Sequence, residues 1–198
     1  MLIYDIEIIN AIPPKDPADR IDGIKYCAGW HDFEHMGIAV VGAYDYVEDA
    51  YRVFCGDNLT DFWGLAMDQD CLVGFNSISF DNKLLAVEGF DFDKLPCFDI
   101  LREVWAGAGL AAEFDPASHK GFGLDAMARA NTGHCKSGSG ADAPIQWQRG
   151  QIGVVIDYCL CDVWLTKQLM DRILIPAPLR SPRDNSWIDV RWPVGLDP

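Results

Sequence analysis

Short apolar runs and longer amphipathic segments alternate along the chain, and this pattern predicts a mixture of strands and helices. Runs rich in β-branched and aromatic residues predict strands at residues 1–9, 36–46, 49–55, 71–75 and 95–99. Helical periodicity predicts helices at residues 59–70, 81–89, 100–106, 121–132 and 151–172. This order is typical of an α/β fold with a mixed central sheet flanked by helices, in which the first and fourth strands are neighbours.

Three segments without regular periodicity connect or follow these elements. Residues 10–35 contain several prolines and glycines and predict a long loop that folds over an edge of the functional site. Residues 134–144 are rich in glycine and serine, which predicts a flexible linker. The expected organisation is one domain over residues 1–175 and an extended tail over residues 176–198. We expect the tail's tryptophans to hold it along the domain, with stacking on unpaired bases as the alternative.

Composition favours a globular intracellular protein. The 198 residues are 49% hydrophobic, which is enough for one sizeable core. The seven cysteines are an odd number and include no CxxC pair, so a reducing compartment fits better than a disulfide framework or a zinc knuckle. No leader-like segment opens the chain and no apolar run approaches about 18 residues, so we expect a cytoplasmic protein without a membrane partner.

The charge balance limits the kind of nucleic-acid contact that the chain can make. Sixteen basic residues against 30 acidic ones give a formal net charge of −14. Nucleic-acid-binding domains usually carry a basic footprint, so any binding of phosphates is expected to be local here. Two divalent cations at one spot would supply the missing positive charge.

Acidic residues interrupt the apolar elements at three places. Asp5 and Glu7 are two apart on the first strand and therefore point to one face, where repulsion and desolvation both oppose them. Asp81 opens a helix after the fourth strand, and Tyr158 and Asp162 share a face of the last helix. Taken alone, the pattern of Tyr158 and Asp162 predicts only a hydrogen bond between them that stabilises the helix. Together, four carboxylates at one end of a sheet suit hard ions, and two ions can share such a cluster.

The three stretches resemble the Exo I, Exo II and Exo III motifs of the DEDD 3′→5′ exonucleases, found in the proofreading domains of B-family DNA polymerases. The DxE motif matches residues 5–7, the Nx₃(F/Y)D motif residues 76–81 and the YxxxD motif residues 158–162. Asp157 stands where the histidine branch has its histidine, so the resemblance is to the tyrosine branch. The short layout, with Lys-Ser-Gly before the last helix, is similar to phage and bacterial exonucleases akin to polymerase B, and implies a bacterial or phage source.

The resemblance implies a ribonuclease H-like exonuclease fold and a two-metal hydrolysis of the 3′-terminal phosphodiester that releases nucleoside monophosphates. The metals would be Mg²⁺ or Mn²⁺, held by Asp5, Glu7, Asp81 and Asp162. Tyr158 would orient the attacking water, because a phenol with a reference pKa near 10 is a poor base at neutral pH.

Three further residues are expected to contact the nucleic acid. Phe80 and Asn76 would line the terminal base and sugar, with core packing an equal alternative for Phe80. Lys136 would contact a phosphate, although a plain linker is the simpler interpretation of its segment. One departure from the family is Ile8, which stands where a small polar residue often follows the glutamate.

The resemblance leaves the substrate open. Single-stranded DNA or the 3′ end of a duplex is the expected substrate, but RNase D-like enzymes share the tyrosine branch and act on RNA. A third interpretation is a non-catalytic module that binds replication or repair partners through its acidic surface; the presence of all five site residues opposes it.

The motifs themselves contain no basic residue beside the four acids. Without a metal, we therefore expect at least one carboxylate to bind a proton well above its reference pKa near 4.

Overall fold

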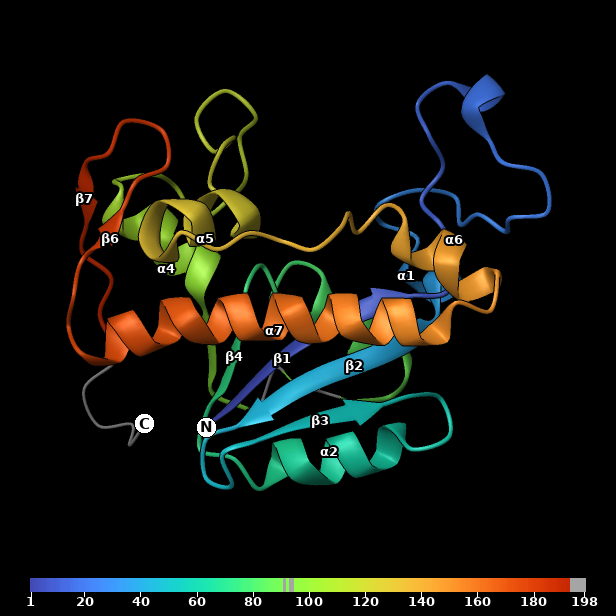
Figure 1. The fold of residues 1–198 in the computed structure, drawn as a ribbon, viewed down its shortest axis with the longest axis horizontal. Coiled ribbons are helices and arrows are strands. Elements are labelled where there is room, and N and C mark those ends of the chain that lie inside the picture. The colour runs from blue at the N-terminus through green and yellow to red at the C-terminus, as the bar shows by residue number, and fades with distance from the viewer. Residues whose placement is uncertain (91, 93–94, 193–198) are drawn as a thin grey trace.

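The computed structural model describes residues 1–90, 92 and 95–192, and its centre is a five-stranded sheet (Figure 1). The strand order is β3-β2-β1-β4-β5. The strands are β1 (Leu2–Ile8), β2 (Ile38–Asp45), β3 (Ala50–Phe54), β4 (Leu72–Gly74) and β5 (Cys97–Asp99). Strand β1 is antiparallel to β2 and parallel to β4, so the sheet is mixed. The predicted fold class and the central pairing of the first and fourth strands are confirmed.

Alternating residues of β1 are buried on opposite faces of the sheet, because successive side chains of a strand point to opposite sides. Leu2, Tyr4 and Ile6 belong to a core that includes Phe62 and Leu84. These last two residues lie on α2 (Leu59–Met67) and α3 (Asp81–Val87), which therefore cover that face.

The opposite face is covered by α4 (Ile100–Gly107), α5 (Leu124–Thr132) and the long helix α7 (Ile152–Leu174), whose buried residues share a core with Ile3 and Val73. Figure 1 shows α7 running across the sheet over β1 and β2. Asp5 and Glu7 have the same parity as Ile3 and thus belong to the α7 face of the sheet. No helix in the described ranges is both long and apolar enough to cross a bilayer.

The long loop at residues 10–35 has more structure than its sequence predicts. It contains a 3-10 turn at Pro17–Asp19 and leads into α1 (Phe33–Met36). A bridge between Ala11 and Tyr26 closes its base. Gln148 of α6 (Ala143–Gln148) then fixes this base, because its side chain accepts from Lys25 N at 2.7 Å and donates to Ile9 O at 2.9 Å.

The segment predicted as an extended tail forms a hairpin in its described part. Strands β6 (Leu179–Arg180) and β7 (Trp187–Ile188) pair antiparallel. Leu179, Ile188 and Val190 are buried in the core on the α7 side, so this part of the chain packs on the domain. The predicted tail's last six residues, 193–198, lie outside the described ranges.

Candidate active site

Strand β1 and helix α7 bring three carboxylates together. Oxygen atoms of Asp5, Glu7 and Asp162 lie within 4.8 Å of one another. Glu7 and Asp162 are buried and Asp5 is half-buried. One oxygen of Asp162, Oδ1, is buried and has no hydrogen-bond partner in the described part of the chain. The group is a candidate metal site, because clustered carboxylate oxygens are the ligands that hard divalent cations prefer.

A glycine on β2 lets α7 lie close enough to the sheet for this grouping. Gly42 pairs with Asp5 across the β1–β2 ladder. A Cβ atom at Gly42 would lie 2.9 Å from Sγ of Cys159 and 3.2 Å from a methyl carbon of Val163, both on α7. The Cys159 thiol in turn donates a weak hydrogen bond to Asp5 Oδ2 at 3.6 Å. Close packing at this point therefore sets the distance between β1 and the helix that carries Asp162.

We expect Gly42→Ala to lower the exonuclease activity that the sequence motifs predict by about tenfold or more, and to destabilise the fold by about 1–3 kcal/mol, because an added methyl group must push α7 away from β1. Hydrolysis rate and urea unfolding would measure the two effects. Gly64→Ala on α2 is the control, since a Cβ there meets nothing within 4 Å. A Gly42→Ala variant with the activity of the parent would show that α7 need not approach so closely.

Asp81 lies beside this group and forms a different contact. Strand β4 pairs with β1 only at Leu2 and Ile3, so the backbone of β1 beyond Ile3 lacks a β4 partner. Asp81, the first residue of α3, is the partner of one backbone group there: its Oδ1 accepts a hydrogen bond from Ile6 N at 3.1 Å. Asp81 is not one of the three carboxylates that lie within 4.8 Å of one another.

Tyr158 and Lys136 complete the surroundings of Asp162. Tyr158 lies one helical turn before Asp162 and is 5% exposed. The Lys136 ammonium donates to Asp162 Oδ2 and, at 3.2 Å, to the Tyr158 hydroxyl. The backbone N–H of Lys136 donates to Asp125 Oδ1 at 2.8 Å, which anchors the linker to α5. A basic residue thus adjoins the acids after all, although it comes from a segment outside the three motifs.

The electrostatics of the group follow from burial and crowding. Burial, with a contribution from the charge of Asp162, raises the pKa of Asp5 to about 7. Burial and the negative charge of Asp5 raise the pKa of Glu7 and of Asp81 well above the usual range. Burial also raises the pKa of Asp162, although Lys136 opposes the shift. The metal-free site therefore retains protons near neutral pH, as expected from the sequence.

Two other groups near the carboxylates keep their protons at neutral pH. Burial raises the pKa of Tyr158 above its usual value, against the opposing charge of Lys136, so its phenol stays neutral. Burial alone would lower the pKa of Lys136, but the negative charges of Asp162 and Asp5 outweigh it and the pKa is raised. The site therefore contains a neutral phenol and a fixed ammonium beside the carboxylates.

The remaining residues expected to contact nucleic acid, Phe80 and Asn76, line two neighbouring cavities. Phe80 lines the same cavity, of about 410 Å³, as the three carboxylates, Lys136 and Tyr158. Asn76 lies in a neighbouring cavity, with a left-handed backbone (φ 67°) that is held by a hydrogen bond from its N–H to Asp99 Oδ1 at 2.9 Å. Trp30, which the sequence motifs do not include, lines both cavities. Its only sequence signal is a tryptophan in a long polar loop.

Comparison with known proteins shows the fold. The chain is similar to a family B DNA polymerase from the hyperthermophilic archaeon Pyrobaculum calidifontis, with a TM-score of 0.57 and 18% sequence identity over 87% of this chain. The aligned region spans 24% of the polymerase chain, so the likeness concerns about a quarter of that protein. No protein-family model and no curated protein matches the sequence. The mixed sheet with its flanking helices is consistent with a ribonuclease H-like fold.

Proposed function

We propose that the chain is a metal-dependent 3′→5′ exonuclease that hydrolyses the 3′-terminal phosphodiester of single-stranded DNA and releases nucleoside monophosphates. The observation that carries the proposal is the cluster of Asp5, Glu7 and Asp162 with Tyr158 beside it, on a fold similar to part of a DNA polymerase. The resemblance of the three sequence motifs to the tyrosine branch of the DEDD exonucleases supports the direction of cleavage.

The residues of the site fit a pair of divalent cations. The donors are carboxylate oxygens, one of them is buried without a partner, and burial raises the pKa of each carboxylate, so a cation would relieve an unfavourable concentration of charge. Asp5, Glu7 and Asp162 would hold Mg²⁺ or Mn²⁺, and Asp81 would join them as the fourth ligand through the oxygen that Ile6 does not use. Bound there, the ions would activate a water molecule and stabilise the charge of the leaving 3′ oxygen.

The protein's own groups would position the reactants. The Tyr158 phenol remains protonated, so it would donate a hydrogen bond that orients water or phosphate and would not act as a base. The Lys136 ammonium lies 3.2 Å from that phenol and would contact the terminal phosphate, as the sequence analysis proposed. Phe80 in the cavity wall would contact the terminal base.

Digestion of 5′-labelled single-stranded DNA in Mg²⁺ or Mn²⁺ should give a ladder that shortens from the 3′ end, with mononucleotides as the product. EDTA should stop the reaction, because the proposed mechanism relies on the ions to activate water. A 3′-phosphorothioate linkage should protect the strand, and circular single strands should resist. Equal cleavage of circular and linear strands would mean that the exonuclease proposal is wrong.

Labelled RNA and duplex DNA should be digested in parallel. Faster digestion of RNA than of DNA would show that the protein is a ribonuclease that uses the same chemistry. A protein that binds nucleic acid or a replication partner but hydrolyses nothing in either metal would be the non-catalytic module.

A further inference from the structure

A second and larger cavity adjoins the candidate active site. It has a volume of about 960 Å³ and shares Trp30 and Phe80 with the carboxylate cavity, so the two lie on either side of these aromatic rings. Its far wall consists of α4 and the segment that precedes α5. Cavities of roughly 300–1,000 Å³ hold drug-sized ligands, so this one has room for at least one nucleotide beyond the terminal one. We call it the aromatic groove.

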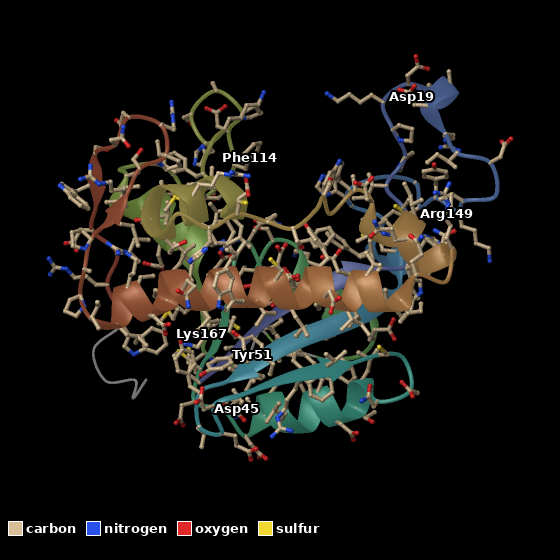
Figure 2. All side chains as sticks on the ribbon, viewed as in Figure 1. Asp19, Asp45, Tyr51, Phe114, Arg149 and Lys167 are labelled. Carbon is tan, nitrogen blue, oxygen red and sulfur yellow. The ribbon has the colours of Figure 1, made fainter. Side chains whose placement is uncertain are left out.

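Two exposed aromatic rings line the aromatic groove. Trp30 is 66% exposed and contacts the edge of Phe80, with ring centroids 6.3 Å apart. Phe114, which lines the aromatic groove but not the carboxylate cavity, is 58% exposed. Figure 2 shows Phe114 and Asp19 on two loops that project to the same side of the molecule. Trp30 belongs to the loop of Asp19, whose base is fixed to α6 by Gln148, so the indole ring is held above the groove rather than buried in the core.

The aromatic groove also carries unpaired positive charge. Arg102 and Lys120 line it, and neither forms an ion pair with a carboxylate in the described ranges. Arg102 Nη2 makes only a long contact of 3.4 Å to Ser79 Oγ, and Arg102 Nε is buried without an acceptor. Glu113 is the acid in the lining, so the groove has a local charge of opposite sign to the chain's net −14.

We propose that the aromatic groove binds the unpaired nucleotides that precede the 3′ end, with a base stacked on Trp30 and phosphates at Arg102 and Lys120. The inference rests on the proposed function for the direction of the strand. Its own support is the aromatic wall that the two cavities share, exposed rings suited to stacking on bases, and cations without ion pairs in the described ranges, which suit phosphates. Because neighbouring base pairs cover both faces of a base inside a duplex, stacking on Trp30 there would require unstacking, so the groove favours single strands.

Binding of 5′-fluorescein oligothymidylates should be measured by fluorescence polarisation, with Ca²⁺ in place of Mg²⁺ to prevent turnover. Affinity should rise from dT2 to dT4 and change little from dT4 to dT8, since the groove holds few nucleotides. Trp30→Ala should weaken binding of dT8 by about 5- to 150-fold, the range of one base–aromatic contact, and weaken binding of dT2 much less. Trp30→Phe should restore most of the affinity.

Matched controls separate the groove from a general loss of aromatic or basic surface. Trp187→Ala replaces a tryptophan that is 57% exposed on β7 and should bind dT8 like the parent. Three phosphate contacts, at Arg102, Lys120 and Lys136, predict a slope of log affinity against log salt of about −2. Arg102→Ala and Lys120→Ala should each make the slope shallower by about 0.7, whereas Arg191→Ala should not change it. Parental affinity in Trp30→Ala, with parental slopes in both basic variants, would overturn the proposal.

A duplex arm tests the selection for single strands. A hairpin duplex with four unpaired 3′ nucleotides should bind at least about tenfold more tightly than the same hairpin with a blunt end, because a blunt end must first be unpaired. Equal affinity would contradict the proposed groove.

The groove and the exonuclease can fail separately. Trp30-dependent binding without hydrolysis in Mg²⁺ or Mn²⁺ would sustain the groove and refute the exonuclease. Hydrolysis together with binding that does not depend on Trp30 would support the exonuclease and refute the groove.

Discussion

Replacing Asp162 with asparagine should remove both metal binding and hydrolysis, whereas replacing Tyr158 with phenylalanine should remove hydrolysis alone. Asp162 contributes a buried oxygen without a partner to the carboxylate group, and an amide would bring a weaker ligand without charge. Tyr158 contributes a neutral phenol that can orient a reactant but adds no charge to the site. The two residues are one helical turn apart, so their separate roles would distinguish a metal centre from a general acidic pocket.

Calorimetric titration with Mn²⁺ and single-turnover hydrolysis would measure the two effects. Asp162→Asn should lose about 10³-fold or more in rate together with its metal affinity, because metal ions contribute several kcal/mol to such transition states. Tyr158→Phe should keep its Mn²⁺ affinity and lose about 10²-fold or more, the range of a positioned proton-transfer group. Asp157→Asn, an exposed change on the same helix, is the control and should behave like the parent. Equal Mn²⁺ affinity in Asp162→Asn and Tyr158→Phe would show that these roles are assigned wrongly.

The sequence predicts the sheet well because its strands have clear apolar patterns. Burial on both faces of β1 gives a continuous apolar run, and only Asp5 and Glu7 interrupt it on the α7 face. The short helix-to-strand connections then leave few ways to arrange the remaining elements. Helix ends are less accurate: α5 begins at Leu124 instead of residue 121, because Gly123 is its N-cap.

The surroundings of the site depend on contacts between distant segments, which local patterns do not reveal. Lys136 reaches Asp162 across 26 residues of sequence, from a linker whose composition indicates only flexibility. Trp30 lines both cavities from a loop whose base is bonded to Gln148, far along the chain. The hairpin of β6 and β7 was also missed, since its strands are two residues each and its prolines favour extended structure.

Asp5→Asn should stabilise the metal-free protein, and the gain should grow with pH. The pKa of Asp5 is about 7 in the folded protein, against an ordinary value of 3.8, because burial and Asp162 disfavour its charge. Between these two pH values the folded state binds more protons than the unfolded state, so the free energy of unfolding falls as pH rises. Asparagine resembles the protonated carboxyl group and does not titrate, so the variant escapes this loss.

Urea unfolding in EDTA at several pH values would measure the difference in the free energy of unfolding between Asp5→Asn and the parent. Between about pH 4 and pH 7 the difference should widen by up to roughly 1.4 kcal/mol per pH unit, and it should level off at higher pH. Asp157→Asn should follow the parent throughout, since this exposed residue lies outside the carboxylate group.

Mn²⁺ should narrow the difference in the free energy of unfolding between the two proteins. At a hundredfold excess over its dissociation constant it should stabilise the parent by about 2.7 kcal/mol, because it binds the folded state alone, and it should stabilise Asp5→Asn far less. Under the proposed function, the same three carboxylates would destabilise the metal-free fold and would bind the ions that relieve their repulsion. A difference between variant and parent that stays constant with pH, or an equal gain from Mn²⁺ in both proteins, would place the charge of Asp5 outside any metal site.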